Sequence, residues 1–239
     1  YNGTTWSEQN NVATARRTSG AGTQTAGIIV GGTNGAPGST GVQTITEEYD
    51  GTNWAGGGSL STARTGILAS GEQTTVYAAG GFNSSSAIIG IYEQYDGTSW
   101  TGSTAMNTDR LNAGAVGNTS SNLVFGGYTP PAFFYASSSE EWNGSSWTVG
   151  GSLNTARISL ASFGSQTNAV GAGGDLPGNS AATEIYDGSS WSTSTSMATA
   201  RQGLTPGSSY NSSSTGMVAG GSQAGNPMNA QTEEWTGAG

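Results

Sequence analysis

The stretch Thr46-Glu47-Glu48-Tyr49-Asp50-Gly51-Thr52-Asn53-Trp54 decides the fold, because close variants of it recur along the whole chain. An Asp-Gly pair between strand-forming residues is typical of a tight hairpin, so the stretch predicts one strand that ends at Tyr49 and another that begins at Trp54. The Trp recurs at intervals of 48, 46, 47 and 44 residues, as Trp6, Trp54, Trp100, Trp147 and Trp191. A period of this length indicates a repeat architecture.

Two further sequence features recur with the same period as the Trp. An Arg follows ten residues after it, as Arg16, Arg64, Arg110, Arg157 and Arg201. A glycine pair comes about sixteen residues later, as Gly31-Gly32, Gly80-Gly81, Gly126-Gly127, Gly173-Gly174 and Gly220-Gly221. Each repeat therefore has a Trp, an Arg and a Gly-Gly in fixed order.

Each unit contains the pattern of four short strands. Small residues follow the Arg, at 66–69, 112–115 and 159–162, and suit a crowded innermost strand. A polar turn and a short apolar run then fit a strand buried on both faces. With the two strands of the hairpin, this predicts an all-β fold: a five-bladed β-propeller of four-stranded antiparallel blades, as one domain over residues 1–239. A linear solenoid is the alternative, but the capping repeats that solenoids carry are not seen.

The ends of the chain predict how the ring closes. The chain begins inside a unit, with Tyr1-Asn2-Gly3-Thr4-Thr5-Trp6 leading into a Trp strand, and its last predicted strand, ending at Trp235, has no Trp strand after it. We expect the N-terminal strand to complete the C-terminal blade and so to remove a free sheet edge. The same pairing between molecules would instead give a chain of subunits. Because there is no initial Met and no visible secretion signal, we also expect a processed product or a piece of a longer protein.

These repeats resemble kelch repeats, which have a Gly-Gly at the end of the second strand, an aromatic residue on the third and a Trp shortly after. The resemblance covers the whole chain, although Tyr49 and Trp54 are spaced more tightly than is usual in kelch repeats. The repeated sequence motifs are similar to those of kelch-like propellers in marine bacteriophage and other environmental proteins. The resemblance implies a structural, attachment or adhesion module in a virion or outside the cell.

Composition argues against several classes of function. The net charge is −9, with no Lys or His, and Arg17 is the only cation outside the repeat pattern, so we expect no nucleic-acid partner and no membrane insertion. Without His, Cys or Lys, catalysis would fall to carboxylates, and only Glu8, Glu72, Asp109 and Asp175 lie off the pattern. A glycoside hydrolase using Asp109 and Asp175 is the less favoured alternative. We predict no enzyme activity, no cofactor and no metal site.

The repeated residues have a structural interpretation and a functional one. The Trp side chains could stack on sugars. Packing between blades is favoured, because a chain with so few hydrophobic residues needs its large aromatic side chains in the core. The arginines could form a ring that binds anions. We favour ion pairs with the equally recurrent acids Glu47, Glu93, Glu140, Glu184 and Glu233.

The candidate binding site lies where the repeat fails, in the variable segments after each Gly-Gly. These are residues 33–41, 82–87, 128–135, 175–179 and 222–229. The third segment stands apart, with the candidate residues Tyr128, Pro130, Pro131, Phe133, Phe134 and Tyr135. Either it is an exposed apolar patch, or Phe133 and Phe134 fold back over the blade. We predict a non-enzymatic structural or interaction module of a virion or extracellular fibre, which binds a protein partner or its own copies through these segments. A lectin-like carbohydrate binder is the alternative.

Overall fold

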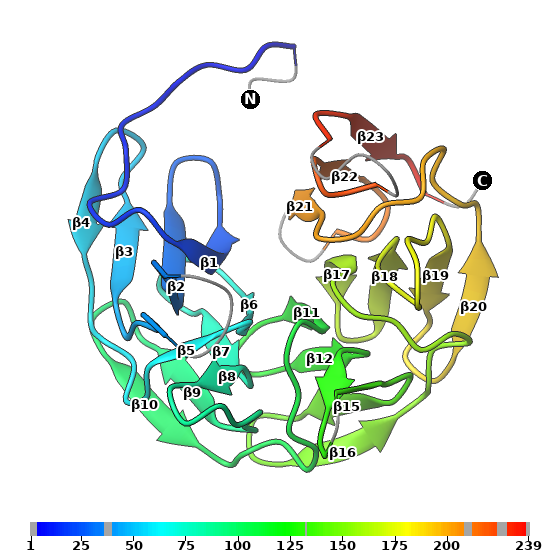
Figure 1. Cartoon of the computed structure of the whole chain (residues 1–239), viewed down its shortest axis with the longest axis horizontal. Coiled ribbons are helices and arrows are strands. Elements are labelled where there is room, and N and C mark those ends of the chain that lie inside the picture. Colours follow the sequence, from blue (N-terminus) through cyan, green and yellow to red (C-terminus); the bar gives the residue numbers. More distant parts are fainter. Residues whose placement is uncertain (1–3, 36–39, 132, 208–211, 224–228, 238–239) are drawn as a thin grey trace.

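The computed structural model describes residues 4–35, 40–131, 133–207, 212–223 and 229–237 of the 239-residue chain. These residues form four four-stranded antiparallel sheets and one three-stranded sheet, which follow one another in a ring (Figure 1). We call the four-stranded sheets blades 1 to 4 and the three-stranded one the fifth sheet. The arrangement is an all-β propeller. None of the described residues forms a helix long and apolar enough to cross a membrane.

Within each sheet the strands lie side by side, with the first strand at the centre of the ring and the last at its outside. Blade 1 contains β1 (Arg17–Gly22), β2 (Gly27–Thr33), β3 (Thr46–Tyr49) and β4 (Trp54–Gly56). Blade 2 contains β6 (Leu68–Ser70), β7 (Tyr77–Ala79), β9 (Tyr92–Tyr95) and β10 (Trp100–Ser103). Blade 3 contains β11 (Gly114–Gly117), β12 (Asn122–Phe125), β15 (Ser139–Trp142) and β16 (Trp147–Gly150). Blade 4 contains β17 (Ala161–Ser165), β18 (Asn168–Ala172), β19 (Thr183–Tyr186) and β20 (Trp191–Ser194). The fifth sheet contains β21 (Thr205–Gly207), β22 (Gly216–Ala219) and β23 (Thr232–Trp235).

The hairpins lie where the repeat predicts them. Tyr49 pairs with Trp54 across the Asp-Gly turn, and the same register recurs in blades 2, 3 and 4. The inner strands β6, β11 and β17 begin two residues later than predicted. The reason is a left-handed backbone before each of them, with φ of 64° at Gly66 and 52° at Asn112 and Ser159. A left-handed residue turns the chain at this point, and the regular ladder of each inner strand begins after it.

The predicted fifth blade is present only in part. The fifth sheet has three strands, and the described N-terminal residues before β1 contain no strand that pairs with β23. Tyr1, Asn2 and Gly3 of the predicted closing strand lie outside the described residues. Figure 1 shows the N-terminal segment arching from β1 over the stretch between blade 1 and the fifth sheet. The structure therefore shows four complete blades, and the side chains of β23 are more exposed than those of β3.

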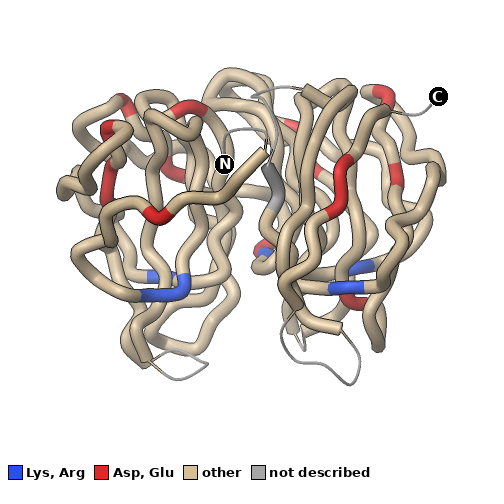
Figure 2. The backbone as a smooth tube through the Cα atoms, turned by 90° about the horizontal axis from the view of Figure 1, so that it is seen from above, with Lys and Arg blue, Asp and Glu red and all other residues tan. Residues whose placement is uncertain are grey.

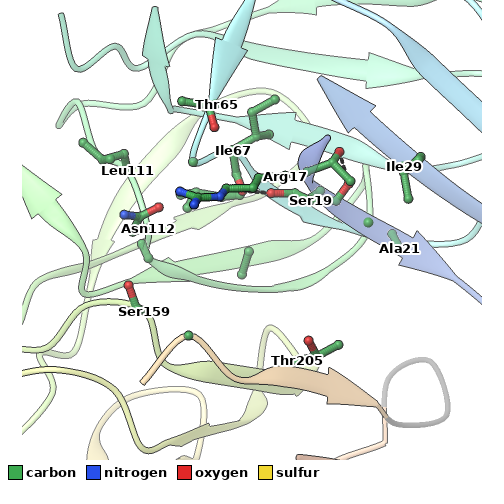
Figure 3. A pocket seen from close by; sticks show the side chains of 18 of the residues that line it. Arg17, Ser19, Ala21, Ile29, Thr65, Ile67, Leu111, Asn112, Ser159 and Thr205 are labelled. Carbon is green, nitrogen blue, oxygen red and sulfur yellow. Dashed lines mark hydrogen bonds between the residues drawn. The ribbon is translucent and has the colours of Figure 1, made fainter. Parts of the chain in front are cut away.

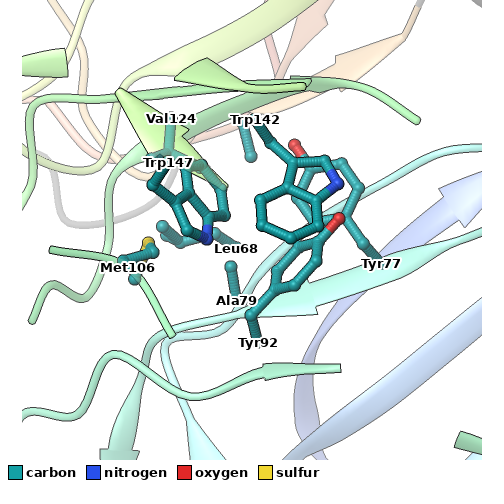
Figure 4. Close-up of a cluster of buried hydrophobic side chains, with 9 residues drawn as sticks. Leu68, Tyr77, Ala79, Tyr92, Met106, Val124, Trp142 and Trp147 are labelled. Carbon is teal, nitrogen blue, oxygen red and sulfur yellow. The ribbon is translucent and has the colours of Figure 1, made fainter. Parts of the chain in front are cut away.

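The hydrophobic core consists of separate clusters between neighbouring sheets. In the cluster between blades 2 and 3, Tyr92 packs against Trp142 at 4.8 Å and Trp147 at 5.2 Å between ring centroids (Figure 4). Similar clusters join blade 1 to blade 2, blade 3 to blade 4, and blade 4 to the fifth sheet. The described residues form no such cluster between the fifth sheet and blade 1. Burial of these rings supplies the main stabilisation of a chain with 33% hydrophobic residues.

Candidate functional site: the aromatic hairpin at the channel mouth

The repeat arginines are structural residues. All five pair with the recurrent acids, as Arg16–Glu47, Arg64–Glu93, Arg110–Glu140, Arg157–Glu184 and Arg201–Glu233. The side chains of these five arginines are completely buried. Burial lowers the pKa of Arg110, and its partner Glu140 offsets part of that effect. Because every repeat arginine is already paired and buried, none is available to bind an anion.

The repeat tryptophans mostly pack between blades. Trp147 and Trp191 are 6% exposed, and the indole of Trp191 lies 4.5 Å from the ring of Phe125 in the preceding blade. Trp54 and Trp100 are half-buried, and the indole N–H of Trp100 donates to Thr46 of blade 1 at 2.9 Å. These positions leave no row of equivalent aromatic platforms for sugars. Only Trp6 departs from the pattern, with 63% of its surface exposed.

The variable segments after the Gly-Gly pairs lie at one end of the propeller, which we call the loop face. Four repeat arginines fix this end by donating to the carbonyl of the first glycine of the pair, as Arg157 does to Gly173 at 2.9 Å, and Arg64 donates instead to the Ala78 carbonyl at 3.2 Å. Seen from the side, the arginines lie toward one end of the molecule and most acidic residues toward the other (Figure 2). The loop face is therefore less acidic than the rest of a chain with a net charge of −9. Parts of two of these segments, residues 36–39 and 224–228, lie outside the described residues.

The third variable segment forms a small hairpin on the loop face. β13 (Tyr128–Thr129) pairs with β14 (Phe134–Tyr135), and the exposed Pro130 and Pro131 stand in the turn between them. Phe133 adopts a left-handed backbone with φ of 55°. Its ring then meets the ring of Tyr128 edge-on, with 5.5 Å between centroids. We call residues 128–135 the aromatic hairpin; Ala132 lies outside the described residues.

Neighbouring blades hold the aromatic hairpin from both sides. Toward blade 2, Phe133 packs against Phe82, with 6.0 Å between ring centroids; Phe82 belongs to β8 (Phe82–Asn83), which pairs with β5 (Arg64–Thr65). Toward blade 4, the Tyr135 hydroxyl donates to Asp175 at 2.6 Å. This hydrogen bond raises the pKa of Tyr135, because ionisation would place a phenolate beside a carboxylate. The hairpin is therefore braced across three blades.

The two phenylalanines have different surroundings. Phe133 is 48% exposed and partly covers Tyr128 and Phe82, so the expected folding back is seen for this ring. Phe134 is the more exposed of the two, with 59% of its surface accessible. A phenylalanine held on a braced hairpin with this much exposure is suited to contact another molecule.

The aromatic hairpin stands at the mouth of the central channel. The channel contains a cavity of about 1000 Å³, which Tyr128, Phe133 and Phe82 line in part. Residues of the inner strands, among them Ser19 and Ala21, line it as well (Figure 3). Arg17, Thr65, Asn112 and Ser159 contribute polar groups to the same cavity. A cavity of this size is in the upper range of those that hold small organic ligands.

The two acids considered for hydrolysis are held in separate local structures. Asp109 accepts a hydrogen bond from the Gly90 backbone, and burial raises its pKa. Asp175 accepts hydrogen bonds from Tyr135 and from the Gly178 amide at 2.8 Å. Neither acid lines the channel cavity. Among the described residues no three acidic side chains gather in a way that could hold a metal ion.

The sequence did not reveal two members of this site. Phe82 could not be assigned to it, because the packing of one variable segment against another follows no period. Arg17 was visible as the one cation outside the repeat pattern, but nothing in the sequence indicated that it faces the channel. Its position follows from β1, the inner strand of blade 1, in which a bulge lies between Arg17 and Ser19.

Comparison with known proteins supports the fold. No protein-family model matches the chain, and no curated protein matches it. A solved structure described as that of YjhT has a TM-score of 0.72 to this chain, at 12% sequence identity, over 90% of this chain and 79% of that one. The chain is similar in fold to this propeller. At such low identity the likeness concerns the fold alone, so the kelch repeat type and a phage origin stay predictions.

Proposed function

We propose that the chain is a non-enzymatic interaction module that binds a protein partner, or further copies of itself, through the aromatic hairpin on the loop face. The observation that carries this proposal is the exposure of Phe133 and Phe134, at 48% and 59%, on a hairpin that both neighbouring blades hold in place. A pre-ordered aromatic anchor loses little conformational entropy when it binds. The resemblance of the repeats favours a virion or an extracellular fibre as the setting.

A carbohydrate ligand is supported at one place only. Because the repeat tryptophans of blades 3 and 4 are buried, a lectin with one site per blade has no set of platforms. Tyr128 and Phe133 still line the channel mouth, where a sugar ring could stack on them. Carbohydrate binding is therefore the second candidate, with a single site beside the aromatic hairpin.

Replacing Phe134 tests the proposed surface. The variant Phe134→Ser should weaken self-association, or binding to an identified partner, by about tenfold or more, because central aromatic anchors often contribute more than 2 kcal/mol. Sedimentation velocity over a concentration series measures the self-association, and a glycan array measures sugar binding. Val149→Ser is the matched control, because Val149 is 80% exposed on the outer strand β16 and is not part of the aromatic hairpin. Equal binding by wild type and Phe134→Ser in both assays would reject the proposal.

We infer that the scaffold of this module is a ring of five blades, in which residues 4–9 supply a fourth strand to the fifth sheet. The register of the other hairpins would place Trp6 opposite Trp235, as Trp147 is opposite Trp142. The segment after Trp6 supports this inference. It contacts blade 1 in the same way that the link between two other blades contacts the blade that follows it. Asn10 donates to the Thr52 carbonyl at 2.8 Å, and Thr104 donates to the equivalent Ser145 carbonyl at 3.3 Å. Donation of the same strand by a second molecule is the alternative.

A further inference from the structure

Arg17 is the one cation among the described residues that has no acidic partner. The five repeat arginines are paired and buried. Arg17 is exposed to the channel, and no Asp or Glu lines the cavity around it. In a chain with a net charge of −9, this cavity therefore has one positive charge and no negative one among its lining residues. A guanidinium in such a place has five N–H donors that no protein group uses.

Three neutral polar side chains lie around the same cavity without partners. In Figure 3, Arg17 extends from β1 into the cavity in the direction of Asn112, with Thr65 and Ser159 on the adjoining segments. Within the described part of the chain, the side chains of Thr65, Asn112 and Ser159 make no hydrogen bond. Each of them can donate, and all three belong to the segments that follow repeat arginines. The cavity therefore offers several hydrogen-bond donors beside one positive charge.

The backbone that carries these donors is held from blade to blade. The Asn112 amide donates to the Gly66 carbonyl at 3.2 Å, Ser159 donates to Asn112 at 2.8 Å, and Gly203 donates to Ser159 at 2.9 Å. These four residues have left-handed backbones with φ between 52° and 64°. A continuous chain of hydrogen bonds thus fixes Asn112 and Ser159 before any ligand arrives. Donors that are positioned in advance bind an anion at a lower entropic cost.

The rest of the cavity is too large and too apolar for an inorganic ion alone. Ile29, Ile67, Leu160 and Leu204 line it below the polar groups, and its volume is about 1000 Å³. We propose that the channel mouth binds the carboxylate of an organic anion. Arg17 holds that group through two N–H donors, Asn112 and Ser159 donate to it, and the apolar body of the ligand enters the channel. The proposal deepens the proposed function, because it names the group that a ligand presents beside the aromatic hairpin.

Calorimetric titration with matched pairs of probes tests this site and identifies the source of the carboxylate. Phenylacetate and its neutral amide represent a free small molecule, and a tripeptide ending in Phe, with a free or amidated C-terminus, represents the end of a protein partner. We expect at least one acid to bind wild type about tenfold or more tightly than its amide, since a charge-assisted bidentate pair is worth more than about 1.4 kcal/mol. Arg17→Gln should remove this preference, and Arg17→Lys should restore it in part.

Two controls keep this result separate from the proposed function. Arg17 is exposed and unpaired, so Arg17→Gln should keep the circular dichroism spectrum and the unfolding midpoint of wild type. Phe134→Ser, which impairs the docking surface, should leave the preference of the cavity for acids intact. The anion site is wrong if acids and amides bind equally, if neither acid binds at millimolar concentration, or if Arg17→Gln keeps the preference. Those results would leave the aromatic hairpin untouched as a protein-binding surface.

Discussion

The junction between blades 3 and 4 and the junction between the fifth sheet and blade 1 carry corresponding residues but differ in their contacts. At the first, the Tyr186 hydroxyl of β19 donates to Glu141 of β15 at 2.5 Å. At the second, Glu234 of β23 and Tyr49 of β3 occupy the same repeat positions, but the Tyr49 hydroxyl donates to Gln9 at 3.2 Å. The two junctions therefore differ in the partner of the same tyrosine hydroxyl, and the second junction is the one whose sheet has only three described strands.

The residue types that face each other across neighbouring sheets follow one rule, and the residues at the second junction fit it as well. Where the next sheet presents Tyr, the preceding sheet presents Glu, as in the hydrogen-bonded pairs Glu48–Tyr95 and Glu141–Tyr186. Where the next sheet presents Trp142 or Trp235, the preceding residue is Gln94 or Ile185, which carries no charge. The reason is that a phenol can donate to a carboxylate at this position, whereas an unpaired carboxylate against an indole would be costly. Glu234 and Tyr49 match as neighbours in a closed ring.

The largest expected effects come from the buried ion pairs of blade 4 and of the fifth sheet. Glu184→Gln in blade 4 should destabilise the protein by about 3–5 kcal/mol, because Arg157 keeps its charge in a buried position without a counter-charge. The equivalent Glu233 side chain in the fifth sheet is 23% exposed, against 3% for Glu184, so water would soften the loss in an open ring. In the closed ring that we propose, a fourth strand would cover β23, and Glu233→Gln should then cost nearly as much as Glu184→Gln. Urea unfolding of both variants measures the difference, and a much smaller cost for Glu233→Gln would indicate an open ring.

A smaller effect should come from the Tyr–Glu pairs, which double-mutant cycles measure directly. The reference cycle combines Tyr186→Phe with Glu141→Gln and should give a coupling of about 1.5–3 kcal/mol, as expected for a hydrogen bond to a charged group. In a closed ring, Tyr49→Phe and Glu234→Gln should give a coupling of similar size. No coupling between Tyr49 and Glu234 would contradict closure. Repeating the second cycle at low protein concentration separates closure within one molecule from strand donation, since only strand donation weakens on dilution.

Alkaline titration provides a second measure of the same pairs. Burial and the bond to Glu141 raise the pKa of Tyr186 from its ordinary value of 10.0 to about 12. Because the folded-state pKa is the higher one, the stabilisation is complete below pH 10 and is lost as the pH rises toward 12. Tyr186→Phe should flatten this part of the stability curve.

Local pattern and stoichiometry made most of the fold predictable. The third strands and their Asp-Gly hairpins follow from neighbouring residues, and the pairing of Arg with Glu follows from one of each per repeat. The inner strands were misplaced by two residues because Asn112 and Ser159 adopt left-handed backbones that neither residue type requires. The candidate hairpin was found as an exception to the repeat. Its support by Phe82 was not, because contacts between variable segments depend on tertiary structure alone.

The smallest expected effect concerns the hairpins, which should behave alike at both junctions. Asp50 in blade 1 and Asp187 in blade 4 each accept two backbone N–H bonds across their turns, and these bonds lower the pKa of both carboxyls. The stabilisation is therefore present above the ordinary pKa of 3.8 and is lost as the pH falls through the lowered value. In blade 3, Asn143 accepts the same bonds without a titrating group, at 3.0 and 2.9 Å.

Asp50→Asn and Asp187→Asn should consequently fold as well as wild type at neutral pH and lose less stability in acid. Each replacement should reduce the number of protons taken up on unfolding by up to about one. The slope of the free energy of unfolding against pH, between roughly pH 2 and pH 5, measures this number. Equal effects at the two positions would show that the hairpin of blade 1 is formed whether or not the ring is closed. If Asp50→Asn changed the pH dependence of stability less than Asp187→Asn does, the hairpin of blade 1 would instead depend on the strand that covers it. The difference between the two junctions would then extend beyond β23 into blade 1 itself.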